Sequence, residues 1–395
     1  MNYAKRLSWL EDQSLLKAFQ LAETEDMISF SAGFPSSETY PLDAVKESMA
    51  RVIDNQGETA LSYCSTSGYS KLRQILTKRM SDKFNLEYAL DEIIITSGSQ
   101  QGLDMSGMLF INEGDVVIFE EPSYLGAVNA LRAYQAELVS VPTDREGMEI
   151  PALKETLEKY GTRVKMVYVN PDFQNPTGRS WSDGRRKDFM EFMSGYDIPV
   201  LEDAAYGELS FDEERQKPLA YYDQKGQVVY IGTFSKIFCP GLRVAWLCAR
   251  RDIMEKYLVL KNAADLSSST IAQMQMADYM ENNDLDLHIK SICTLYKHRR
   301  DVMAKMIDSE FPKEVNYVLP KGGLFIWLEL PEGKDAAELL IRAAQKKVAF
   351  ITGASFYLST KKNNELRLNF SNMSDEKTEI GMKILGAITK EYLNV

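Results

Sequence analysis

Residues 231–246 read IGTFSKIFCPGLRVAW. Apolar runs at 228–234 and 244–249 predict two strands on either side of a Pro-Gly break. Lys236 follows the first run, and Arg243 comes just before the second. Burying a lysine at the end of an apolar strand costs desolvation free energy, so Lys236 needs a chemical reason to be there.

Five more apolar runs precede this stretch, at 92–96, 115–120, 136–142, 165–171 and 198–204. Helix-length segments separate most of them. This alternation predicts an α/β fold in which helices sandwich a mostly parallel sheet. Ligands of such sheets bind at the carboxyl ends of the strands, so the polar residues that follow each run are candidate site residues.

The chain has 395 residues, which is too long for one compact core. Residues 273–310 carry one long helical pattern, and the remainder reads as strands around a helix at 334–347. We predict an N-terminal arm at 1–40 that joins the small domain, a large domain at 41–295 and a smaller α+β domain at 296–395.

Composition excludes several classes of partner. The formal net charge is −11 and no Lys/Arg-rich run occurs, which argues against nucleic acids and anionic membranes. The four cysteines are scattered, the chain does not start like a signal peptide, and no long apolar run occurs. Together these features indicate a cytoplasmic protein. The two histidines, His288 and His298, lie outside any metal-binding motif, so we predict no metal site.

Two stretches that follow strand-like runs are only weakly informative. Ser99, in TSGSQQGLD (96–104), begins a predicted helix whose backbone N–H groups could bind an anion, and a helix N-cap explains it equally well. Tyr124, in EEPSYLG (120–126), could stack on a flat ring or merely cover the sheet edge.

Two other stretches are more informative. NPDFQNPTG (170–178) predicts a rigid loop that could aim the Asn175 amide, although a plain turn is the alternative. Asp203, in LEDAAY (201–206), would be buried at the sheet edge unless a cation pairs with it. Asp203 could hold a positive charge of a ligand or cap a helix, and its sequence context favours neither role.

One ligand accounts for all these residues: a phosphorylated, planar, protonatable ring that carries an aldehyde. Backbone N–H groups near 98–100, with Thr233 and Ser235, would hold the phosphate. Lys236 would bind the aldehyde carbon, because desolvation and a cationic neighbour such as Arg243 lower the lysine pKa toward the working pH.

The ring itself would be held from three sides. Tyr124 would stack on it and Asp203 would pair with its nitrogen. Asn175 and Tyr206 would bind its phenolic oxygen. The cofactor that fits is pyridoxal 5′-phosphate, whose ring acts as an electron sink.

The motifs SGSQQGLD, EPSY, NPDFQNPTG, EDAAY, TFSKIFCPGLRVAW and LRLNFS, in this order, resemble those of the fold-type I, class I/II aminotransferases. The resemblance covers roughly residue 28 to the C-terminus and favours the branch of 2-aminoadipate, kynurenine and aromatic aminotransferases. It implies an aspartate-aminotransferase-like large domain, pyridoxal phosphate and catalysis by Lys236, Asp203 and Tyr206.

The resemblance also implies binding roles. The phosphate-binding positions are matched by Ser99, Gln100, Thr233, Ser235 and Arg243. Arg367 matches the arginine that binds the substrate α-carboxylate, with Asn175 beside it, and Gly33 lies in the loop that closes over the substrate. Tyr63 resembles the tyrosine that reaches the phosphate of the neighbouring subunit, which implies a homodimer with shared active sites.

Two departures from the family pattern stand out. Many relatives carry S-x-I-R where this chain has SLLK (14–17), so Lys17 replaces an arginine that could read a distal carboxylate. Many also carry EDDxY where this chain has EDAAY. Because Ala204 is not aligned with the partner of the ring nitrogen, we expect little effect from it.

The predicted function is transfer of an amino group from an L-amino acid, aromatic, aminoadipate-like or long aliphatic, to a 2-oxo acid such as 2-oxoglutarate. An alternative is another fold-type I reaction, such as C–S β-elimination or decarboxylation. A third is a cofactor-binding regulator without turnover, but the match begins near the N-terminus, where we expect no DNA-binding module.

Overall fold

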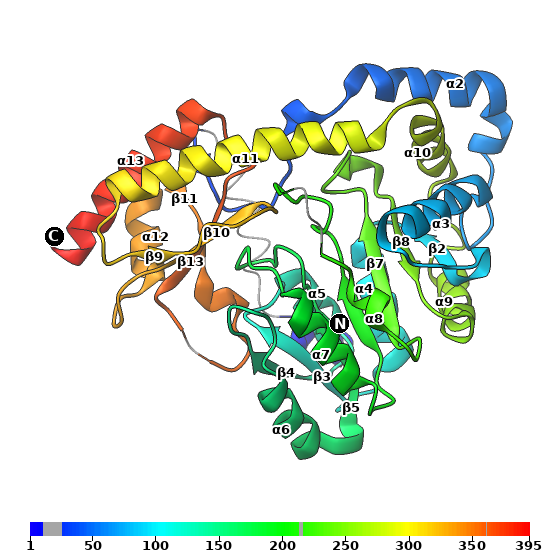
Figure 1. Ribbon diagram of the computed structural model, residues 1–395, viewed down its shortest axis with the longest axis horizontal. Helices are drawn as coiled ribbons and strands as arrows, with labels where there is room; N and C mark the ends of the chain where they lie inside the picture. Colours follow the sequence, from blue (N-terminus) through cyan, green and yellow to red (C-terminus); the bar gives the residue numbers. More distant parts are fainter. Residues whose placement is uncertain (11–25, 213–215, 361) are drawn as a thin grey trace.

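The computed structural model describes residues 1–10, 26–212, 216–360 and 362–395 (Figure 1). Lys17 lies outside the described residues. Within them, the central sheet has seven strands in the order β2-β8-β7-β6-β5-β3-β4. Its strands are β2 (Ile93–Thr96), β3 (Val116–Glu121), β4 (Glu137–Pro142), β5 (Val164–Val169), β6 (Val200–Asp203), β7 (Val228–Thr233) and β8 (Ala245–Cys248). Only β8 runs antiparallel to its neighbours, so the predicted mostly parallel sheet is confirmed.

Helices cover both faces of this sheet, because successive residues of a strand point to opposite sides. In β3, Val117 packs in one core with residues of α4, α5 and α9, whereas Ile118 packs in another with residues of α6, α7 and α8. These helices are α4 (Ser99–Phe110), α5 (Leu125–Arg132), α6 (Ile150–Tyr160), α7 (Asp183–Met193), α8 (Leu219–Tyr222) and α9 (Arg251–Ala264). The predicted sandwich of helices around the sheet is therefore present.

The helical pattern at 273–310 belongs to two helices, so the prediction of one continuous helix was wrong. α10 (Thr270–Asn282) ends before Asn283, whose backbone is extended, and α11 (Leu285–Glu310) begins after Asp284. The Asp284 carboxylate accepts hydrogen bonds from Asp286 N and Leu287 N, which caps the new helix. Figure 1 shows α11 running from the side of α10 to the side of α13 (Asp375–Leu393).

Three more α-helices and two smaller sheets complete the architecture of the described chain. α2 (Leu42–Ala60) and α3 (Ser70–Phe84) pack against α10. The second sheet has the order β12-β13-β10-β9, with β9 (Asn316–Tyr317), β10 (Phe325–Glu329), β12 (Ile351–Thr352) and β13 (Glu365–Asn369). β1 (Ile28–Ser29) pairs in parallel with β11 (Val348–Ala349), and α12 (Ala336–Gln345) packs against α13. The chain start thus pairs with a strand near the C-terminus.

The predicted boundary between 295 and 296 falls inside α11. The division into an arm and two domains stays a prediction. Among the described residues, no helix has both the length and the apolar character needed to cross a membrane.

Candidate active site

Six of the predicted residues line one cavity at the carboxyl edge of the central sheet. Its lining comes from the N-terminal segment, the loops after the strands, β12 and β13: Ser31, Ala32, Gly33, Phe34, Tyr124, Asn175, Tyr206, Lys236, Ile351 and Arg367. Chain segments far apart in sequence meet here because parallel strands bring their carboxyl ends to one edge.

Lys236 is poised as a nucleophile and base. It follows β7, and its Nζ donates a hydrogen bond to the Gly33 carbonyl at 3.0 Å. Burial lowers the pKa of the Lys236 ammonium to about 8, and the positive charge of Arg367 acts in the same direction. Asp203 opposes this shift. A substantial fraction of Lys236 is therefore neutral near pH 8.

Asp203 is a buried carboxylate at the end of β6, with 4% of its surface exposed. Its Oδ2 accepts a hydrogen bond from the Tyr168 hydroxyl at 2.9 Å, and its Oδ1 accepts one from Ala205 N at 3.3 Å. Burial raises the pKa of Asp203 to about 6, although both hydrogen bonds and Lys236 lower it. The group remains ionised at neutral pH and can hold a cation.

Arg367 and Asn175 form the polar wall on the other side. Arg367 Nη1 donates to Asn175 Oδ1 at 2.6 Å, and Nη2 donates to the Ser31 carbonyl. Among the described residues, its buried Nε has no hydrogen-bond partner. The guanidinium carbon lies 4.2 Å from the centre of the Phe325 ring. Burial lowers the pKa of Arg367 to about 10, so it stays charged at neutral pH and can receive a carboxylate.

Tyr206 stands beside Asn175, whose Nδ2 donates to the Tyr206 hydroxyl at 3.5 Å. Burial holds the pKa of the Tyr206 hydroxyl well above its usual value. Tyr206 therefore keeps its proton and can donate a hydrogen bond into the cavity.

Next to the cavity, hydroxyl groups and an arginine gather at the start of α4. Thr233 Oγ1 donates to Ser235 Oγ at 3.0 Å, and Arg243 Nη1 lies 3.4 Å from the same oxygen. A Cβ on Gly98 would lie 2.1 Å from Arg243 Nη2, so Arg243 packs directly on the turn before Ser99. Helix N–H groups, hydroxyls and a guanidinium together suit a phosphate. The N-cap of α4 is Gly98 and not Ser99, so the capping alternative for Ser99 was wrong.

Three further predicted residues have clear positions. Gln100 Nε2 donates to the Gly126 carbonyl at 2.8 Å, which joins the start of α4 to the loop of Tyr124. Tyr124 is half-buried and immediately precedes α5. Gly33 must lack a side chain, because a Cβ there would lie 2.8 Å from Phe325 Cζ. Tyr63, in contrast, is 88% exposed and lies outside the cavity of its own chain.

Sequence reasoning missed Tyr168 and Asn170. The Tyr168 hydroxyl donates a hydrogen bond to the Asp203 carboxylate, and Asn170 Nδ2 donates one to the Asp203 backbone carbonyl. Asn170 Oδ1 also accepts from Asn175 N at 2.9 Å. Both belong to the run KMVYVNP, where a tyrosine and an asparagine in an otherwise apolar strand were the available signal. Ser31 and Ile351, which also line the cavity, carry no comparable signal.

The comparison with known families decides the identity. Residues 25–385 match the family model described as aminotransferase class I and II. The chain belongs to this family. It is 38% identical over 394 residues to aromatic-amino-acid aminotransferase 1 of Thermococcus litoralis, covering 99% of this chain and 94% of that protein.

Solved aminotransferases have the same fold. The kynurenine aminotransferase of Pyrococcus horikoshii, in complex with PMP, has a TM-score of 0.94 and 35% identity, over 100% of this chain and 98% of that one. LysN, the α-aminoadipate aminotransferase of Thermus thermophilus, complexed with N-(5′-phosphopyridoxyl)-L-leucine, has a TM-score of 0.92 and 33% identity, over 99% and 98%. The predicted aspartate-aminotransferase-like fold and aminotransferase function are thereby confirmed.

The aminotransferase uses pyridoxal 5′-phosphate. The residues present fit this group. A helix start beside hydroxyls and Arg243, a buried carboxylate and a lysine with a lowered pKa all lie at the carboxyl ends of the strands. Arg367, whose Nε has no partner among the described residues, has a donor free to receive a carboxylate.

Proposed function

We propose that this aminotransferase takes its amino group from an aromatic, aminoadipate-like or long aliphatic L-amino acid and gives it to a 2-oxo acid such as 2-oxoglutarate. The observation that carries this proposal is that aromatic and aliphatic side chains surround Arg367. Its guanidinium lies among aromatic rings, with Phe325 at 4.2 Å and Phe356 at 5.1 Å, and Phe34 and Ile351 line the same cavity. A carboxylate receptor beside apolar walls favours the aromatic and long aliphatic donors. The aminoadipate-like donor rests on the similarity to the α-aminoadipate aminotransferase LysN.

We assign the phosphate of the cofactor to the start of α4 and the adjoining hydroxyls. The proposed phosphate-binding residues are Ser99, Gln100, Thr233, Ser235 and Arg243. Arg243 supplies positive charge, and the helix start supplies backbone N–H groups. Tyr124 is the proposed stacking partner of the ring, and Asn175 and Tyr206 are the proposed donors to its phenolic oxygen.

Two of the proposed catalytic residues, Asp203 and Lys236, act on a proton, and Tyr206 acts through its hydrogen bond to the phenolic oxygen. When bound, pyridoxal phosphate supplies an electron sink for negative charge at the substrate Cα. Asp203 holds the proton of the ring nitrogen, since its carboxylate is buried and ionised at neutral pH. Arg367 orients the substrate through its carboxylate, and Lys236 Nζ removes and returns the Cα proton. Gly33, whose carbonyl accepts a hydrogen bond from Nζ at 3.0 Å, belongs to the loop that we propose closes over the substrate.

We further propose a cytoplasmic homodimer with shared active sites. Tyr63 and Leu61 are 88% and 76% exposed, and Leu266 is 55% exposed with a backbone φ of +60°. Large side chains held outward on a constrained backbone fit a surface that a second copy covers. Tyr63 would then reach the phosphate of the partner subunit. The cytoplasmic assignment rests on four scattered cysteines, all of which are free.

The donor assignment is tested with a panel of L-amino acids, 2-oxoglutarate as acceptor, and glutamate formation as readout. Phenylalanine, 2-aminoadipate and leucine should outperform alanine by kcat/KM. Release of ammonia without an acceptor would instead identify an eliminating enzyme. Lys236→Ala should abolish multiple turnover, whereas Lys321→Ala, at an 82% exposed side chain, should keep the parent rate.

A further inference from the structure

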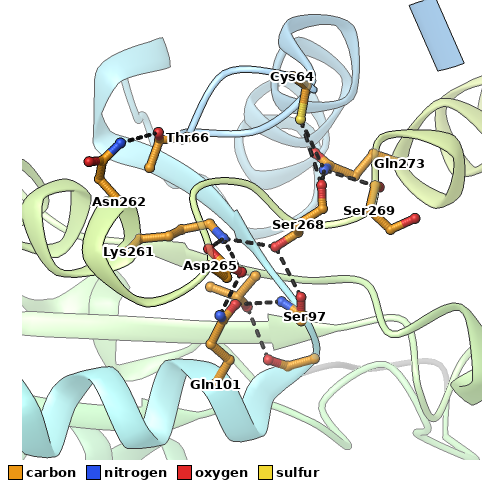
Figure 2. Close-up of polar contacts among 12 residues, drawn as sticks. Cys64, Thr66, Ser97, Gln101, Lys261, Asn262, Asp265, Ser268, Ser269 and Gln273 are labelled. Atoms are coloured by element: carbon orange, nitrogen blue, oxygen red, sulfur yellow. Dashed lines mark hydrogen bonds and ion pairs between the residues drawn. The ribbon is translucent and has the colours of Figure 1, made fainter. Parts of the chain in front are cut away.

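A buried lysine that the proposed mechanism does not use lies behind the phosphate-binding turn. Lys261, on α9, has no exposed side-chain surface. Its Nζ donates to both carboxylate oxygens of Asp265 at 2.8 Å and to Ser268 Oγ at 2.9 Å (Figure 2). All three donor positions of the ammonium are thus occupied.

These contacts continue into a closed ring of hydrogen bonds. Asp265 Oδ2 accepts from Gln101 Nε2 at 2.7 Å, and Gln101 Oε1 accepts from Ser97 N at 2.8 Å. Ser97 Oγ then donates to Ser268 Oγ at 3.2 Å, which returns the ring to Lys261 (Figure 2). Ser97 and Gln101 stand on either side of Gly98, Ser99 and Gln100, so the ring clamps both ends of the turn to which we assign the phosphate.

The same segment also holds the loop that carries Tyr63. The Ser268 carbonyl accepts from Gln273 Nε2 at 3.0 Å and from Cys64 Sγ at 3.7 Å. Asn262 Nδ2 donates to Thr66 Oγ1 at 3.2 Å, and Thr270 Oγ1 donates to the Ser62 carbonyl at 2.7 Å. The loop is therefore bonded on both sides of Tyr63.

A buried ion pair of this kind adds little net stability, because desolvation of both charges offsets their attraction. Removing Lys261 alone, however, leaves the Asp265 carboxylate without its cation, so Lys261→Met should also lower the free energy of unfolding. A positioning role must therefore appear as a selective loss of phosphate binding. We propose that Lys261 is a positioning residue for phosphate binding. It fixes the turn at 97–101 and the loop at 62–66, which carries Tyr63, relative to each other. This inference rests on the phosphate site assigned under Proposed function.

The test compares pyridoxal phosphate with pyridoxal, which lacks only the phosphate. Holoenzyme is stripped of cofactor and titrated with each compound, for the parent, Lys261→Met and Gln101→Leu. Both variants should weaken pyridoxal phosphate about tenfold, the equivalent of roughly one hydrogen bond, and change pyridoxal less than about twofold. Arg300→Met, which removes another buried cation, is the matched control and should leave the ratio of the two affinities unchanged.

Equal weakening of both compounds would overturn the inference, because it would mean that Lys261 only maintains the fold. Variants that bind pyridoxal phosphate as tightly as the parent would overturn it as well. If Lys261→Met does not fold, Gln101→Leu decides alone. A parent enzyme that binds both compounds equally would overturn the phosphate site itself, and the inference with it.

A double-mutant cycle tests the link to Tyr63. If Lys261 acts partly through this loop, Tyr63→Phe should weaken pyridoxal phosphate less in the Lys261→Met background than in the parent. Effects that simply multiply would refute that link.

Discussion

Replacing Arg367 by methionine should remove selective recognition of the substrate carboxylate. The side chain is 3% exposed, and its Nε has no partner among the described residues. A carboxylate bound by the guanidinium fork would gain two charge-assisted hydrogen bonds, each contributing about 1.5–3 kcal/mol. We take the lower end, about 3 kcal/mol in total, because the carboxylate loses its water contacts. This corresponds to about a hundredfold in affinity.

The assay measures binding of 3-phenylpropionate and of its neutral amide to the holoenzyme, together with kcat/KM for phenylalanine. Arg367→Met should weaken the carboxylate about a hundredfold and the amide less than about threefold. Arg367→Lys keeps a point charge but loses the planar fork, so an intermediate loss of about tenfold is expected. Equal weakening of the acid and the amide would refute the reasoning, because it would show that Arg367 supports the cavity and does not read the charge.

Three further predictions concern Lys236, Asp203 and the turn to which we assign the phosphate. In the apoenzyme, the rate at which pyridoxal phosphate attaches to Lys236 should rise with pH around a midpoint near 8, because only the neutral amine reacts; a midpoint near 10 would contradict the lowered pKa. Tyr168→Phe removes a hydrogen bond that lowers the pKa of Asp203, so this pKa should rise above about 6. The kcat of the Tyr168→Phe variant should then fall most at pH 6 and recover toward pH 8. A loss of kcat that does not depend on pH would argue against a raised pKa of Asp203 as its cause. Gly98→Ala should weaken the cofactor and lower the Tm, because the new Cβ would lie 2.1 Å from Arg243 Nη2 at a φ of +80°; unchanged binding would show that the turn relaxes freely.

Much of the fold could be read from the order of residues. Each of the seven strands of the central sheet within the described chain lies inside a predicted apolar run or extends one residue beyond it. Strands buried on both faces, such as β6 and β7, require continuous apolar side chains, whereas β4 at the sheet edge is only partly buried. The strand ends and the proline-rich loop at 170–178 pointed to Asp203, Lys236 and Asn175. The family resemblance then added Arg367. The break between α10 and α11 was missed, because periodicity continues across Asn283 and Asp284 although the backbone does not.

The sequence by itself therefore determined the α/β class, the strand positions and the chemistry available at the strand ends, since these depend on local patterns of polarity and on Pro and Gly. Only the tertiary structure decided which groups touch. Arg367 bonds Asn175 across 192 residues, and Tyr168 supplies the hydroxyl to Asp203 because β5 and β6 are neighbours in the sheet. The ring around Lys261 likewise joins segments that no motif connects. Such partners depend on strand order and side-chain packing between distant segments, and no short stretch of sequence carries that information.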